Sequence, residues 1–176
     1  QRRKLLILIK KYSAKRQREL NQRRDGLSAV SSGVFLLLIG AMFLVTPNLY
    51  SAVKIFFQDF QLVETAPNFF LPAPVSNHPV LYLAVEVFCY IWGLFQIVIL
   101  VLRFSLGSSI YLKAKTLSRI LFWLGAGLLA GMLGTRILGT ASRGWFAFWS
   151  GVLILLGLSL IAQATVLAAT MQRKSP

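Results

Sequence analysis

One acidic residue lies inside an apolar stretch of this chain: Glu86, in residues 80–104. A charge in hydrocarbon is costly unless it is paired, neutralised or hydrated. Two interpretations are open: a proton or cation site facing a helix bundle, or a structural acid bonded to another segment or reaching the interface. No other long apolar stretch carries an acid that could extend a relay, so we favour the structural role. Arg136 and Arg143, expected near the same boundary, are its candidate ion-pair partners.

Two further polar residues lie in long apolar stretches, Gln96 and Gln163. We expect them to form interhelical hydrogen bonds, as amides within membrane spans do. With Glu86 they form a candidate intramembrane polar site. His78, the single histidine, precedes Pro79, and we expect an exposed or capping role, because a lone histidine without a Cys or acid cluster makes a poor metal site.

Motifs for enzymatic chemistry are missing from the sequence. It has no HExxH, CxxC, GxxxxGK[ST] or GxSxG pattern. With one histidine and with Asp25 and Asp59 predicted on opposite sides, a Ser-His-Asp triad cannot assemble. We therefore predict a protein that is not an enzyme and that has no catalytic, cofactor-binding or metal site.

Four apolar stretches must position these residues, and they cover about 27–46, 80–104, 117–134 and 145–171. A helix needs roughly 20 apolar residues to cross a bilayer. Only 14% of the 176 residues are charged, against about 25% in soluble domains. The sequence predicts an all-α, integral membrane four-helix bundle over residues 27–171, preceded by a basic arm (1–26) and followed by a short tail (172–176).

The net charge of +14 is distributed unevenly. Most basic residues lie in the arm, in the joint between the second and third stretches, and in the tail, whereas Lys54, Arg136 and Arg143 lie on the other side. Basic segments stay cytoplasmic. We predict a multi-pass protein of the cell membrane with both termini in the cytoplasm.

Residues 2–24 of the arm have the pattern of a basic amphipathic helix, with Leu5, Leu8, Ile9 and Tyr12 on one face. Such a helix lies on anionic lipids of the inner leaflet, or it joins an upstream domain. We do not favour nucleic-acid binding, since no recognised binding module accompanies the charge.

The joint at 47–79 faces the outside in this topology. Apolar residues from Leu49 to Phe60 recur at helical spacing, which predicts an extracytoplasmic amphipathic helix. A proline-rich loop is expected after it, because prolines do not join regular ladders. Four phenylalanines here are candidates for contact with lipid or a partner: Phe57, Phe60, Phe69 and Phe70.

The third stretch contains a GxxxG motif, Gly127 and Gly131. Small residues at this spacing let helices approach closely in lipid. Packing within the chain and formation of a homo-oligomer are both compatible with the motif.

Four segments carry a resemblance to known sequences: RRDGLSAVSSGVFLLLIGAMFLVTPNL, FFQDFQLV, LPAPVSNHPVLY and GLFQIVILVLRF. They resemble a set of uncharacterised archaeal multi-span membrane proteins over residues 23–104, with a looser match in the last two stretches. The resemblance implies that a small cytoplasmic domain, sometimes a zinc ribbon, can precede the first span. It implies no activity and no functional residues.

The leading hypothesis is a non-enzymatic accessory or scaffold subunit of a larger membrane complex, or the membrane anchor of an upstream domain. It follows from the scarcity of buried polar residues and from the apolar outer joint. The alternative is a small transporter or channel that uses Glu86, Gln96 and Gln163. A sensor of bilayer stress is a third interpretation that the residues do not distinguish from the first.

Overall fold

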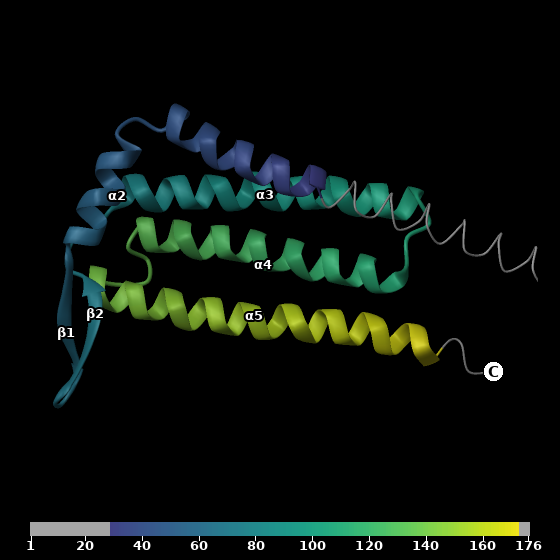
Figure 1. The fold of residues 1–176 in the computed structure, drawn as a ribbon. Coiled ribbons are helices and arrows are strands. Elements are labelled where there is room, and N and C mark those ends of the chain that lie inside the picture. Colours follow the sequence, from purple (N-terminus) through teal and green to yellow (C-terminus); the bar gives the residue numbers. More distant parts are fainter. Residues whose placement is uncertain (1–28, 173–176) are drawn as a thin grey trace, which may run out of the picture. The chain divides into compact units, whose positions relative to one another are not determined.

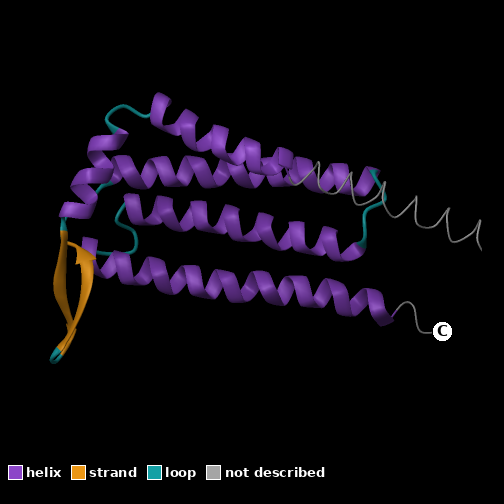
Figure 2. Ribbon diagram, viewed as in Figure 1, coloured by secondary structure: helices purple, strands orange, loops and turns teal. Residues whose placement is uncertain are grey.

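The computed structural model describes residues 29–172, and the predicted basic arm (1–26) and nearly all of the tail (172–176) lie outside this range. A helix at Ala29–Val45 comes first. It is followed by α2 (Leu49–Gln58), β1 (Phe60–Ala66), β2 (Phe69–Pro74), α3 (Pro79–Ser105), α4 (Ile110–Gly134) and α5 (Ala141–Gln172) (Figures 1 and 2).

Among the described residues, three helices are long and apolar enough to cross a membrane. The mean hydropathy of their most apolar segments is 2.2 for α3, 1.5 for α4 and 2.3 for α5. The helix at Ala29–Val45 gives a fourth candidate if it is counted with α2 as one bent span. A helical protein with three to four candidate spans confirms the coarse prediction from the sequence, whereas the closed four-helix bundle stays a prediction.

The chain divides into two compact units, residues 1–41 and 42–176. The second unit contains α2 to α5. Within it α4 lies between α3 and α5 and packs against both (Figure 1). Helix α2 and the two strands lie at the end of these helices where α3 and α5 begin. The fold therefore places α2 and the hairpin, from the joint at 47–79, at one end of a row of three apolar helices.

Glycines make the contact between α3 and α4 close. A Cβ atom added to Gly127 would lie 3.0 Å from the ring of Tyr90 on α3, and one added to Gly131 would lie 2.6 Å from Oε1 of Glu86. The GxxxG motif therefore packs against α3 of the same chain. Of the two roles that the sequence left open for the motif, the structure shows the intramolecular one.

The prediction of a proline-rich loop after α2 is wrong. Residues 60–74 form an antiparallel hairpin, with Phe60 opposite Pro74 and Leu62 opposite Pro72. In a two-stranded sheet, alternate N–H groups of each strand point away from the partner. Pro72 and Pro74 are two residues apart, so both can occupy positions that need no hydrogen-bond donor. Asn68, with φ of 62°, makes the turn, and the all-α fold class therefore omits one small sheet.

Candidate functional site

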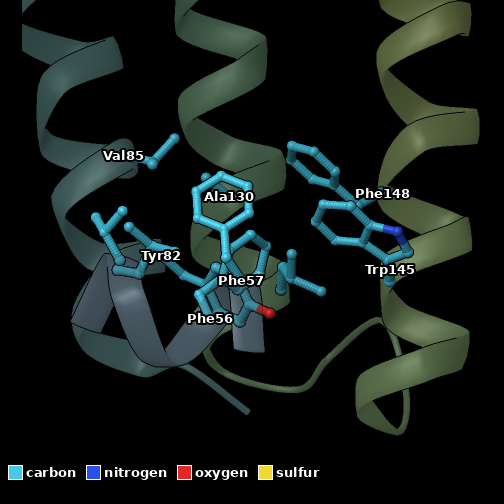
Figure 3. Close-up of a pocket in the computed structure, with 10 residues that line it drawn as sticks. Phe56, Phe57, Tyr82, Val85, Ala130, Trp145 and Phe148 are labelled. Atoms are coloured by element: carbon cyan, nitrogen blue, oxygen red, sulfur yellow. The ribbon is translucent and has the colours of Figure 1, made fainter. Parts of the chain in front are cut away.

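The second unit contains an apolar pocket of about 340 Å³ between α2 and the neighbouring ends of α3, α4 and α5 (Figure 3). Side chains from all four helices line it: Val53, Phe56, Phe57, Leu81, Tyr82, Val85, Ala130, Leu133, Trp145 and Phe148. Small-molecule sites usually measure about 300–1,000 Å³ and are mainly apolar. The pocket has the size and lining of a binding site for an apolar group.

The geometry of each helix places its lining side chains on the face that borders the pocket. Leu81, Tyr82 and Val85 are spaced as neighbours on one face of α3, and Trp145 and Phe148 are one turn apart on α5. Ala130 and Leu133 have the same one-turn spacing on α4. The residues that each helix contributes thus follow from helical periodicity, whereas the pocket itself forms only when the four helices pack together.

Tyr82 lines the pocket with its ring and carries a buried hydroxyl group. The residue is only 5% exposed, and its hydroxyl has no hydrogen-bond partner among the residues that the structure describes. Figure 3 shows the oxygen atom of Tyr82 among the lining side chains. A buried polar group left without a partner costs about 1–3 kcal/mol. The oxygen has almost no exposed surface and the surface of the pocket is wholly apolar, so the hydroxyl is buried beside the pocket and is not presented to it.

Phe56 holds α2 over this space by ring contacts. Its ring meets the rings of Phe60, His78 and Trp145 edge-on, with centroid distances of 5.1, 5.3 and 5.7 Å. Edge-to-face pairs at these distances are favourable beyond the area they bury. Phe60 also packs edge-on against Trp145 at 5.5 Å, so it belongs to this internal cluster.

Asp59 joins the end of α2 to the start of α3. Its Oδ2 accepts a hydrogen bond from the backbone N–H of Ser76 at 2.6 Å and lies 2.9 Å from Nε2 of His78. Its Oδ1 accepts the Ser76 hydroxyl at 3.1 Å. The Ser76 N–H and then the bond to His78 lower the pKa of Asp59 below its usual 3.8.

His78 differs from the expectation in its exposure. It occupies the position before the first turn of α3, but its side chain makes no capping hydrogen bond and bonds to Asp59 instead. The residue is 8% exposed. The prediction of an exposed role is wrong, because the hairpin between Asp59 and His78 brings these two residues into contact. Recognising the hairpin in the sequence would have revealed this pair.

The predicted polar residues are spread along the helices. Glu86 is half-buried against Gly131, Gln96 is buried, and Gln163 is half-buried on α5. With a rise of 1.5 Å per residue from the start of each helix, they lie roughly 10, 25 and 33 Å from the end that carries α2. The structure does not gather them into one site.

The proposed ion pair of Glu86 is not formed in the described part of the chain. Arg136 lies in the turn after α4 and Arg143 in the first turn of α5, and both are exposed. Within residues 29–172, the one ion pair joins Asp59 and His78. Glu86 is thus a half-buried carboxylate within a candidate span that these two arginines do not neutralise.

The candidate contact phenylalanines fall into two groups. Phe57, Phe69 and Phe70 are 71%, 56% and 53% exposed, whereas Phe60 faces the internal aromatic cluster. Three of the four therefore present apolar surface at the end of the molecule that carries α2 and the hairpin.

Comparison of the chain with protein-family models, with curated proteins and with solved structures finds no match. The resemblance to archaeal multi-span membrane proteins stays a prediction from the sequence. Function is therefore argued from the geometry of the described residues.

Proposed function

We propose that this protein is a non-enzymatic subunit of a larger membrane complex, with an accessory or scaffold role, or the membrane anchor of an upstream domain. The observation that carries the proposal is the exposed apolar face of the hairpin. Leu62 and Phe70 there are both more than half exposed. Apolar surface outside the candidate spans favours contact with another protein.

The strand register explains why this face is free. Glu64 pairs with Phe70 and Leu62 pairs with Pro72, so Leu62, Glu64 and Phe70 share one face. The opposite face carries Val63 and Leu71, which line a groove with the start of α5, and Glu64 also contributes to this groove. The hairpin is thus supported by α5 on one side and offers the other side to a partner.

In our proposal, the positions of the basic residues set the orientation of the protein in the membrane. Lys113, Lys115 and Arg119 belong to the beginning of α4, at the end opposite the hairpin. Positive charge near span ends favours the cytoplasm. The proposal therefore has a cell-membrane protein with an extracytoplasmic hairpin and cytoplasmic termini, whose arm contacts anionic inner-leaflet lipids.

Gentle extraction from native membranes, followed by mass spectrometry of the intact complex, tests the subunit role. We expect a stoichiometric protein partner that is lost when Phe70 is replaced by Ser. Val75→Ser is the matched control, because Val75 is 48% exposed directly after the hairpin. Recovery of the wild-type protein alone, as a monomer or homo-oligomer, would contradict the role as a subunit.

A small transporter or channel is the second candidate. Its support is the Glu86 carboxylate, which lies within a candidate span without an ion pair to any described residue. Acids in such positions usually serve ion pathways or pair with other groups. Flux through proteoliposomes that disappears in Glu86→Gln would place this function above the first, and an unchanged flux would remove it.

A further inference from the structure

We propose that the outer edge of β1 is the docking site for an extended segment of a partner protein, which joins the hairpin as a third strand through backbone hydrogen bonds. The segment carries an apolar residue beside Leu62 and, two residues further along, a basic residue beside Glu64. This inference rests on the proposed role as a subunit and deepens it, because it names where and how the partner binds.

The register of the hairpin decides which backbone groups of β1 are free. In an antiparallel pair, residues that bond to the partner strand alternate with residues whose N–H and C=O groups point away from it. The N–H of Val75 donates to the C=O of Asp59 at 3.4 Å, directly before β1. Leu62 and Glu64 are an odd number of residues from Asp59, so their backbone groups point to the outer edge.

The prolines of β2 agree with this alternation and block the other edge of the hairpin. Pro72 lies opposite Leu62, so it also occupies a position that points away from the partner strand. Pro74, two residues further along, has the same orientation. Proline has no N–H to donate, and prolines on an edge strand hinder pairing with another chain. The outer edge of β2 is therefore blocked, whereas β1 contains no proline.

The edge of β1 is accessible. Helix α5 packs against β2, and β1 lies on the side of β2 that faces away from α5 (Figure 1). Leu62 is 71% exposed, and Glu64 is exposed as well. Among the described residues, no loop or side-chain group bonds to the backbone of either residue. A row of unpaired backbone donors and acceptors is a template for strand addition.

The orientation of this edge favours a partner protein over a second copy of the chain. The hairpin lies at one end of the row of helices α3 to α5, and β1 is the strand further from them along their length (Figure 1). In the proposed topology, the edge therefore faces away from the membrane in every copy. A two-fold pairing needs two edges that face each other, which copies in one membrane do not provide. A segment outside the membrane reaches the edge directly.

The side chains at the edge define the chemistry of the segment. Leu62 and Glu64 lie on the same face of the sheet as the exposed Phe70. Glu64 is the single charged residue of β1, and it forms no ion pair within residues 29–172, although Arg143 lines the same groove. Apolar pairs and pairs of opposite charge stabilise neighbouring strands. An apolar residue and a basic residue at positions i and i+2 of the segment therefore fit this edge.

Hydrogen–deuterium exchange at the level of single residues tests the pairing. The complex extracted gently from native membranes is compared with the same full chain purified alone in detergent. In the chain alone, the amides of Leu62 and Glu64 should exchange fast and those of Gln61 and Val63 slowly, because only the second pair bonds to β2. In the complex, we expect exchange at Leu62 and Glu64 to slow at least about tenfold.

Leu62→Pro removes one outward N–H group, and Pro72 shows that the hairpin accepts proline at such a position. Leu62→Ala is the matched control, since it shortens the side chain but keeps the N–H. We expect Leu62→Pro to retain at least about fivefold less partner than Leu62→Ala. Slow exchange at Gln61 and Val63 in the isolated Leu62→Pro protein confirms that the hairpin is intact.

The outcomes separate this inference from the proposed function. Suppose that a stoichiometric partner is recovered, that Leu62 and Glu64 still exchange fast, and that Leu62→Pro binds as well as Leu62→Ala. The subunit role then stands and strand addition is overturned. Slow exchange at both amides in a homo-oligomer would assign the edge to a second copy and overturn the choice of a partner protein. Recovery of the chain alone with fast exchange overturns both the subunit role and strand addition.

Discussion

Tyr82 carries a buried hydroxyl that lowers the stability of the folded protein. It is 5% exposed, and the described residues provide no hydrogen-bond partner for it. Tyr82→Phe should therefore raise the free energy of unfolding by about 1 kcal/mol, because an unsatisfied polar group is removed. Thermal unfolding in detergent, followed by circular dichroism, measures this. A lower melting temperature would mean that the hydroxyl has a stabilising partner.

Asp59 makes the attachment of α2 sensitive to acid. Its pKa is lowered in the folded state by the Ser76 N–H and by His78, from a usual value of 3.8. A lowered pKa contributes stability that is present above pH 3.8 and is lost as the pH falls through the folded value. In a protein whose other three tryptophans are replaced by phenylalanine, we expect the fluorescence of Trp145 to change below this pH, because α2 separates and its Phe56 ring leaves Trp145.

Asp59→Asn is the control for this pH dependence. The amide keeps the size of the side chain but cannot lose a charge on acidification. We expect the variant to attach α2 more weakly at neutral pH and to show no acid transition in Trp145 fluorescence. An acid transition that persists in Asp59→Asn would assign it to another group.

Glycine residues let α3 and α4 pack closely against each other. A Cβ atom at Gly127 would meet the Tyr90 ring at 3.0 Å and Cβ of Cys89 at 3.2 Å. Gly127→Leu should destabilise the pair by roughly 1–3 kcal/mol, as other overpacked cores do. Gly157→Leu on α5 is the control, since a Cβ atom added there would have no atom within 4 Å. Equal melting temperatures for the two variants would contradict close packing at Gly127.

Helix α2 and the hairpin show which elements local patterns can predict. The spacing of apolar residues from Leu49 onward indicates a helix, and the structure has α2 at Leu49–Gln58. The prolines of the following segment favour a loop, yet this segment forms β1 and β2. Helical periodicity is contained within a few turns of sequence, whereas strand pairing depends on which N–H groups face the partner strand.

For the molecule as a whole, the direction of insertion can be tested with single cysteines. Cys89 is the only cysteine of the chain and is buried in α3, so Cys89→Ser provides a background without thiols. Asn68→Cys places a thiol at the exposed hairpin turn, and Ser109→Cys places one in the exposed turn between α3 and α4. In intact cells, a membrane-impermeant maleimide should label the first and spare the second. The reverse pattern would invert our topology.

The amino-acid sequence was enough to predict a helical protein with several candidate membrane spans. Runs of apolar residues long enough to cross a bilayer are a property of local composition, so no tertiary information was needed. The amphipathic character of residues 49–60 was equally readable, and it placed α2. The absence of enzymatic motifs and the unequal distribution of charge also come from the sequence.

Which residues meet was settled by the tertiary structure. Asp59 and His78 are 19 residues apart and become neighbours only when the hairpin between them pairs. Gly131 packs against Glu86 of α3 and not against a second copy of α4, because α3 lies on that side of the helix. The pocket draws its walls from four helices, and no single segment of the sequence carries its pattern. Contacts between distant segments depend on packing in three dimensions, which local periodicity does not encode.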